Sequence, residues 1–284
     1  MSPRFLASLA ALALPLDAAP AQPSTPAPEA AAVRHFVEAV TVETEGQVAR
    51  FHEPVCPLSR GLPPDYNHVV EERVRAIARA VGIPVGRPAG CLPNLIVLVA
   101  EDGEAVTETL RGERPDIFAG LDSAEIRRAI AGGGPVRTWQ SSVTRRAEGA
   151  PIAENRDSYL FQDVHLFHGV PAGLLRETTR RDLRLSMILF DVDAIDGLTL
   201  MQLADHAAMR GLAPTRSAAA AAGKSILALF DESAAGRDPP QAATEWDGAY
   251  LRALYRADAS LDGRAQRSSL ARLLERNLRP TRGR

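Results

Sequence analysis

The sequence predicts an α+β domain: a small mixed or antiparallel sheet with packed helices and a mostly helical C-terminal third. Three observations support this class. Strand-like and helix-like runs alternate as far as residue 197, nearly every later segment has helical periodicity, and no internal repeat is present. The 284 residues, 45% of them hydrophobic, suffice for one sizeable core. We therefore expect a single domain over residues 33–284, helical from about 198 to 284.

The first 21 residues have the pattern of a secretory signal peptide. A short positive stretch, "MSPR", precedes the apolar run "FLASLAALALPL", and "APA" at 19–21 supplies small residues for cleavage near Ala21–Gln22. No cysteine follows to carry a lipid anchor, and no stretch reaches the roughly 18 apolar residues of a transmembrane helix. The mature protein is therefore expected to be soluble, without a transmembrane segment, and periplasmic or secreted.

The mature chain is predicted to begin with an extended tether. Residues 22–32, "QPSTPAPEAAA", are rich in proline and alanine and contain no large apolar residue. Residues 34–44, "RHFVEAVTVET", are enriched in β-branched side chains, which favours a first strand.

A helix is predicted over residues 65–82, "DYNHVVEERVRAIARAVG". Its apolar side chains recur at helical spacing: Val70, Val74, Ile77 and Val81. Asp65 or Asn67 is expected to cap its start and Gly82 to end it.

The middle of the chain alternates strands and short helices. Residues 94–102, "NLIVLVAED", form an apolar run typical of a strand buried on both faces. Residues 103–112 and 122–132 are predicted as short helices, the second with a D-x-x-E capping box. Residues 135–146 and 183–195, "PVRTWQSSVTRR" and "LRLSMILFDVDAI", are the next expected strands.

Four helices are expected after Gly197, at residues 199–211, 224–230, 245–258 and 264–278. In the third, Trp246, Tyr250 and Leu254 share a stripe that favours core packing over ligand stacking.

The helix at 199–211, within "DGLTLMQLADHAAMRGLA", has signals at both ends. Thr199 and Gln202 match a T-x-x-Q capping box, and Gly211 fits the position after the last turn. Small and apolar residues form one narrow face, so the polar residues are expected on a wetter opposite side: Gln202, Asp205, His206 and Arg210.

The two cysteines, Cys56 and Cys91, are predicted to form a disulfide. An exported protein meets an oxidising compartment, where a lone pair of cysteines usually bonds. Two free structural thiols are the alternative. Neither cysteine has a basic or helix-N-terminal setting that would make a reactive thiolate.

Composition argues against nucleic acid as a partner and leaves other partners unknown. The net charge is −2 and aromatic residues make up 5%, so neither a basic field nor a stacking platform is indicated. Residues 264–284 carry seven arginines beside a leucine stripe. This favours a packed terminal helix with a solvated basic face; contact with an anionic surface is the alternative.

Three short motifs resemble ligand sites but fail their spacing rules. Residues 218–225, "AAAAAGKS", lack the first glycine of a phosphate-binding loop. Residues 191–197, "DVDAIDG", misplace the third acid and the glycine of a calcium loop. His165 and His168 in "HLFH" have no third metal ligand marked by spacing. No motif predicts a cofactor or a bound metal.

Candidate catalytic residues are therefore dispersed along the chain. The residues that a hydrolase, with or without a metal, would draw upon are His165, His168, Asp191, Asp193 and His206. No pair of them has a spacing that specifies a reaction.

Several segments together resemble a group of uncharacterised exported proteins from alphaproteobacteria. The matching stretches are "PVCP", "GLP", "CLPNLIV", "ERPDIFAGL", "GPVRTW", "DGLTLMQLADHAAMRGL", "ILALFD" and "YLRALY". They are spread between residues 54 and 255, so the resemblance covers most of the mature chain. The chain is also distantly similar to a secreted, zincin-like domain family. The resemblance implies an exported location and a fold, and it carries no activity.

A zincin helix requires H-E-x-x-H, with two histidines on one face and a glutamate as general base. After His206 the sequence has Ala207, and Arg210 occupies the position four residues on. The sequence therefore favours a non-catalytic structural or binding module, on a scaffold resembling the zincins without their metal motif. The alternative is a periplasmic hydrolase, metal-dependent or not, with a site assembled from dispersed residues.

Overall fold

The computed structural model describes residues 29–132, 134–152, 177–216, 221 and 223–279. The predicted signal peptide, cleavage site and residues 22–28 of the tether lie outside this part of the chain, as do His165 and His168.

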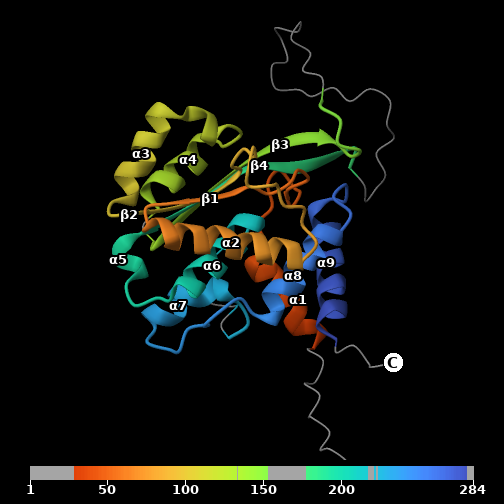
Figure 1. Ribbon diagram of the computed structural model, residues 1–284. Coiled ribbons are helices and arrows are strands. Elements are labelled where there is room, and N and C mark those ends of the chain that lie inside the picture. Colours follow the sequence, from red (N-terminus) through yellow and green to blue (C-terminus); the bar gives the residue numbers. More distant parts are fainter. Residues whose placement is uncertain (1–28, 133, 153–176, 217–220, 222, 280–284) are drawn as a thin grey trace, which may run out of the picture.

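A four-stranded mixed sheet runs through the centre of the molecule (Figure 1). Its strands are β1 (Pro57–Arg60), β2 (Leu95–Ala100), β3 (Val136–Arg146) and β4 (Thr179–Asp191), in the order β1-β2-β4-β3. β1, β2 and β4 are parallel, whereas β3 is antiparallel to β4. The predicted α+β class with a small mixed sheet is confirmed. β1 is only four residues long, too short for an alternation to be recognised.

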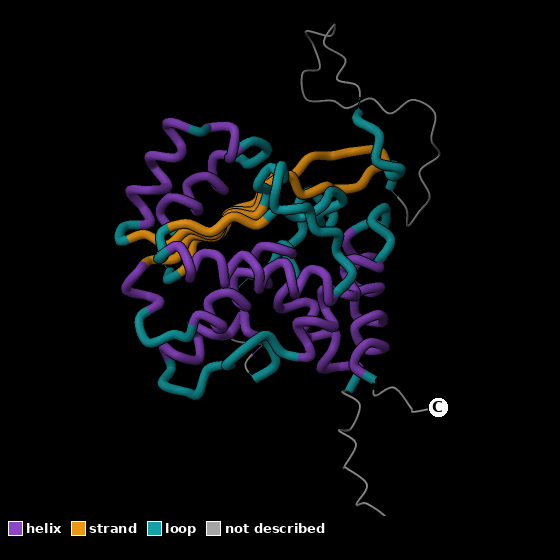
Figure 2. The backbone as a smooth tube through the Cα atoms, viewed as in Figure 1, coloured by secondary structure: helices purple, strands orange, loops and turns teal. Residues whose placement is uncertain are grey.

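Helices cover both faces of the sheet, as the tube in Figure 2 shows. On one face lie α2 (Pro64–Ala80) and α6 (Leu200–Leu212). On the other lie α3 (Gly103–Glu113), α4 (Ser123–Ala131) and the short 3-10 helix η1 (Pro115–Phe118). The predicted helices at 65–82, 103–112 and 122–132 are thus confirmed, including the Asp122–Glu125 capping box.

The helical C-terminal third packs beyond α6. It comprises η3 (Ile226–Ala228), α7 (Leu229–Ala234), α8 (Glu245–Arg256) and α9 (Gly263–Leu278), with the N-terminal helix α1 (Ala30–Val40) against α9. Tyr250 is fully buried and contacts Phe36 of α1, as does Trp246. The aromatic stripe of α8 is therefore core, as predicted.

The segment predicted as the first strand, residues 34–44, is instead helical as far as Val40, where α1 ends, and residues 41–44 follow the helix outside any of the four strands. The buried side chains of α1 are Val33, Phe36, Val37 and Val40. Their spacing of i, i+3, i+4 and i+7 is helical, and this periodicity outweighs the β-branched composition. Because α1 begins at Ala30, the last residues of the predicted tether also belong to this helix.

The run predicted as a strand over 183–195 changes structure at Asp191. β4 ends there, and Val192–Ile195 form the one-turn helix α5, followed by Gly197 at φ +76°. Asp191 and Asp193 therefore do not share a strand face. The local acid-rich sequence satisfies a helical turn as readily as a strand end.

Two predicted helix ends are also wrong. α2 begins at a Pro63–Pro64 pair without a side-chain cap, because Asn67 is buried and hydrogen-bonds to Ser59 and to the Leu62 carbonyl instead. Gly211 lies inside α6 rather than after it. A Cβ at Gly211 would lie 2.7 Å from Leu95 and 3.0 Å from Ile188, so glycine is needed for close contact between helix and sheet.

The predicted cysteine pair is present at disulfide distance. The Cα atoms of Cys56 and Cys91 are 5.9 Å apart, within the range of bonded cysteines. Cys56 immediately precedes β1 and Cys91 lies just before β2, so the pair joins the starts of two neighbouring parallel strands.

The basic C-terminal helix α9 packs through its leucines Leu270, Leu274 and Leu278, which are buried. Arg267 forms an ion pair with Glu43, and Arg279 pairs with Glu275. Among the described residues, no helix combines the length and apolar character needed to cross a bilayer.

Candidate functional site

The described catalytic candidates do not come together. Asp191 accepts two hydrogen bonds from Arg137 Nη1 at 2.8 Å and one from the Gly103 backbone at 3.0 Å. Asp193 lies in α5 and lines a shallow depression with Asp196. His206 lies on α6 between the rings of Phe190 and Phe230. In the described ranges, no three His, Cys, Asp or Glu side chains meet as a metal site would require.

The prediction that α6 has a solvent-exposed polar side is wrong, because this helix is enclosed on nearly every side. Gln202, Asp205 and His206 are all buried. The sheet, α2, η3 and α8 each contact α6, so Gln202 and Asp205 are satisfied by hydrogen bonds within the protein rather than by water. The predicted Thr199–Gln202 capping box is present, and Gln202 also donates to the Pro240 carbonyl.

Asp205 is the buried anchor of this helix. It accepts hydrogen bonds from Arg73 Nε at 2.5 Å and Nη2 at 2.9 Å, and from the Ala243 backbone at 2.6 Å. The carboxylate therefore joins α6 to α2 and to the segment before α8. This role is structural, since the side chain has no exposed surface.

His206 is buried, and neither ring nitrogen has a hydrogen-bond partner in the part of the chain that the structure describes. Its ring centroid lies 5.8 Å from that of Phe190 and 5.0 Å from that of Phe230. Desolvation, and secondarily the charge of Arg210, lower the pKa of His206 to about 3. A histidine enclosed in this way has no open coordination position for a catalytic metal.

Acid should therefore destabilise the protein through His206. Its folded pKa is near 3, below the unfolded value of 6.5, so the unfolded state binds the extra proton between these pH values. The contribution of His206 to the free energy of unfolding is fully present above pH 6.5 and is lost by about 1.4 kcal/mol per pH unit between pH 6.5 and 3. Urea unfolding from pH 7 to 4.5 should show a shallower loss for His206→Leu than for the wild type.

Other titrating groups cancel in that comparison, including His52, whose pKa burial lowers to about 4. Equal pH slopes for the wild type and His206→Leu would contradict the prediction.

A charged cluster surrounds Asp182, and no local sequence pattern predicts it. This buried carboxylate accepts hydrogen bonds from Arg180, and Arg145 and His52 lie 3.4 and 3.5 Å away. The four residues come from β3, β4 and the segment before β1, so only the tertiary structure brings them together. Because Arg180 and Arg145 already balance the charge of Asp182, we assign this carboxylate a structural role.

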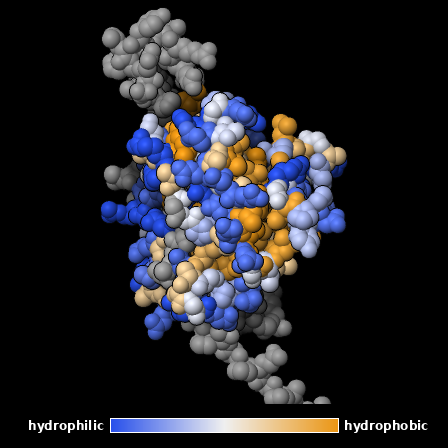
Figure 3. Space-filling view, turned by 90° about the vertical axis from the view of Figure 1, so that its left-hand side faces the viewer, coloured by the Kyte–Doolittle hydropathy of each residue, from blue (hydrophilic) through white to orange (hydrophobic). Residues whose placement is uncertain are grey.

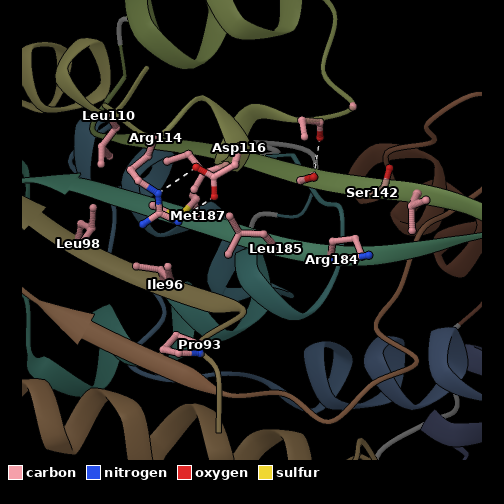
Figure 4. Close-up of a pocket in the computed structure, with 15 residues that line it drawn as sticks. Pro93, Ile96, Leu98, Leu110, Arg114, Asp116, Ser142, Arg184, Leu185 and Met187 are labelled. Carbon is pink, nitrogen blue, oxygen red and sulfur yellow. Dashed lines mark hydrogen bonds and ion pairs between the residues drawn. The ribbon is translucent and has the colours of Figure 1, made fainter. Parts of the chain in front are cut away.

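The candidate functional site is instead a cleft on the sheet face that carries α3, η1 and α4 (Figure 4). Side chains alternate along β2: Leu95, Val97 and Val99 are buried towards α2 and α6, while Ile96 and Leu98 face the opposite side. α3 and η1 cover that side only in part. The cavity volume is about 680 Å³, within the usual range for small-molecule sites.

The floor of the cleft is apolar and its rim is polar. Ile96, Leu98, Leu185 and Met187 of β2 and β4 form the floor, with Leu110 and Ile117 on the helical side. Arg114 and Asp116 at the rim form a two-bond ion pair at 2.9 and 2.8 Å. Figure 4 shows this pair above the floor residues. Figure 3, a view of the end where α3 and α5 lie, shows apolar atoms gathered in the middle with hydrophilic atoms around them.

Arg184 stands at one end of the cleft on a β-bulge. Ser141 pairs with Leu185 and Ser142 with Leu183, so Arg184 is the extra residue of β4 with no partner on β3. Bulges commonly redirect a side chain beside a binding site. Arg184 is exposed, lines the cleft and makes no ion pair with any described residue. The cleft thus combines an apolar floor with the cation of Arg184, which has no ion-pair partner among the described residues.

Comparison with known proteins adds no assignment: neither a family model, nor a curated protein, nor a solved structure matches this chain.

Proposed function

We propose that this protein is an exported, non-catalytic binding module whose ligand is an amphiphile with an apolar body and an anionic end. The observation that supports it is the cleft over β2 and β4, with Arg184 at its end. A ligand chain would cover Ile96, Leu98 and Leu185, and its charged group would meet the guanidinium of Arg184.

Export and membership of the alphaproteobacterial group that the motifs resemble belong to this proposal. The disulfide-distance cysteines are compatible with an oxidising compartment. A hydrolase is the weaker alternative, because Asp191 is neutralised by Arg137 and His206 is enclosed in the core. A cleft lined mainly by aliphatic side chains suits retention of a ligand better than activation of water.

The binding test uses 11-(dansylamino)undecanoic acid as probe, with its methyl ester as the neutral counterpart. We expect saturable binding of the acid, followed by dansyl fluorescence. Ile96→Gln should weaken binding of both probes about fivefold or more, because it places an amide in the apolar floor. Arg184→Ala should weaken binding of the acid to a similar extent and leave the ester unchanged.

Matched controls lie on α2, away from the cleft. Val69→Gln replaces an exposed aliphatic residue, 44% accessible, and Arg79→Ala removes an exposed arginine. Neither should change binding of the acid or of the ester. No saturable binding of the acid, or equal effects of the cleft and control variants, would contradict the proposed site.

A further inference from the structure

A second, smaller cavity lies beside the edge strand β3 and helix α4. Its volume is about 210 Å³. Strand β3, helix α4, the segment after α1 and the end of α6 contribute its walls, which include Thr44, Glu125, Arg128, Trp139 and Arg210. These residues are distinct from those of the cleft.

Arg210 lines this cavity as a positively charged side chain. Its Nε donates to Thr138 Oγ1 at 3.2 Å and its Nη1 donates to the Thr215 carbonyl. No described carboxylate pairs with it, and its Nη2 makes no hydrogen bond with the described residues. Burial lowers the pKa of Arg210 to about 10, so the side chain stays charged at neutral pH while losing hydration. An incompletely solvated guanidinium with a free N–H group is a strong recognition element for an oxyanion.

The cavity contains a second cation, a further N–H donor and one carboxylate. Arg128 uses Nε on the Ala124 carbonyl, and no described residue pairs with its terminal nitrogens. Trp139 is buried, and its indole N–H has no hydrogen-bond partner among the described residues. One carboxylate oxygen of Glu125 accepts a hydrogen bond from the Asp122 backbone N–H at 2.8 Å. Two arginines and one glutamate leave a formal charge of +1, which matches one carboxylate better than a phosphate dianion.

We propose that this cavity binds the carboxylate of a small organic acid, held between Arg210 and Arg128. The site is independent of the amphiphile-binding cleft, so loss of dansyl-probe binding by a cleft variant leaves this proposal unaffected.

Ligand binding to this cavity can be followed by the fluorescence of Trp139, which lines it. The chain contains two tryptophans, so a Trp246→Phe background isolates the fluorescence of the one that lines the cavity. Titration with sodium acetate and sodium succinate, at ionic strength held constant with sodium chloride, should give a saturable change in emission. Constant ionic strength matters because salt screens exposed charges. Inorganic phosphate should bind more weakly than acetate.

Three variants in this background test the charge pattern. Arg128→Gln should weaken acetate binding about tenfold, the loss expected for one charge-assisted contact. Arg127→Gln, on the neighbouring exposed residue outside the cavity, should leave it unchanged. Glu125→Gln should tighten binding several-fold, because glutamine preserves the capping box while removing a negative charge. Arg128 and Glu125 are at the surface of α4, so the test does not depend on Arg210 variants that lose a structural contact.

Acetate and succinate titrations that fail to saturate at about 0.1 M would overturn the site. Equal effects of Arg128→Gln and Arg127→Gln would also overturn it. Tighter binding of phosphate than of acetate would overturn the assigned ligand class.

Discussion

Replacement of Asp205 by alanine is expected to lower the free energy of unfolding by about 3–4 kcal/mol, as is typical when one partner of a buried ion pair is removed. The carboxylate is completely buried and satisfies Arg73 and the Ala243 backbone N–H. Its loss leaves that N–H without an acceptor, although Arg73, one-third exposed, can turn towards water. Urea denaturation at pH 7 with linear extrapolation measures the change.

A double-mutant cycle separates the ion pair from the other contacts of Asp205. Arg73→Met alone leaves a buried carboxylate held by one backbone donor, so we expect a loss of similar size. The double variant should be more stable than the sum of the single losses predicts, with a coupling of about 1.5–3 kcal/mol. Arg79→Met, on an exposed position of the same helix, should change stability by about 0.5 kcal/mol or less. Additive single effects would show that Arg73 and Asp205 do not stabilise each other.

Features encoded by neighbouring residues were predictable from the sequence. The valines of α2 recur at helical spacing, and the capping boxes at Asp122 and Thr199 each lie within four residues. The local sequence of α1 also contains its helical signal. The β-branched composition of residues 34–44 favours a strand, but the spacing of the buried side chains predicts the helix that forms: Val33, Phe36, Val37 and Val40.

Features that depend on contacts between distant residues were not predictable. Asp205 and Arg73 are separated by 132 residues, and nothing near Asp205 in the sequence shows that its helix is enclosed on nearly every side. Hydrophobic periodicity assumes one wet face, so it placed Asp205 and His206 in water.

The candidate sites belong to this second class. The cleft exists because α3 and η1 leave part of the sheet uncovered, which is a property of packing between elements. Arg184 acquires its position from a register shift between β3 and β4, and a single strand sequence does not encode such a shift. The sequence contains one relevant signal. β2 is a continuous apolar run, so both of its faces are apolar, and the second face must be covered either by the protein or by a ligand.

Loss of the cysteine pair is expected to destabilise the protein by about 3–4 kcal/mol, the chain-entropy value for a loop closed across 35 residues. The pair closes the β1–α2–β2 crossover, in which two parallel strands must meet across an intervening helix. Asn94 strengthens the junction by accepting from the Cys56 N–H at 2.8 Å, and its side chain donates to the Pro54 carbonyl. A Cβ at Gly86 would collide with both sulfurs, so the segment before Cys91 is also fitted to the pair.

The Cys56→Ala/Cys91→Ala variant, compared with the wild type by urea unfolding, measures this effect without leaving a free thiol. Adding tris(2-carboxyethyl)phosphine to the wild type should reproduce the loss, whereas the double variant should not respond to the reductant. Thiol titration of denatured, unreduced wild type should find no reactive sulfur. Two titratable thiols in that sample would contradict the disulfide. Because β1 has only four residues, we expect unfolding of the variant to begin at the crossover, with amide exchange fastest in β1 and α2.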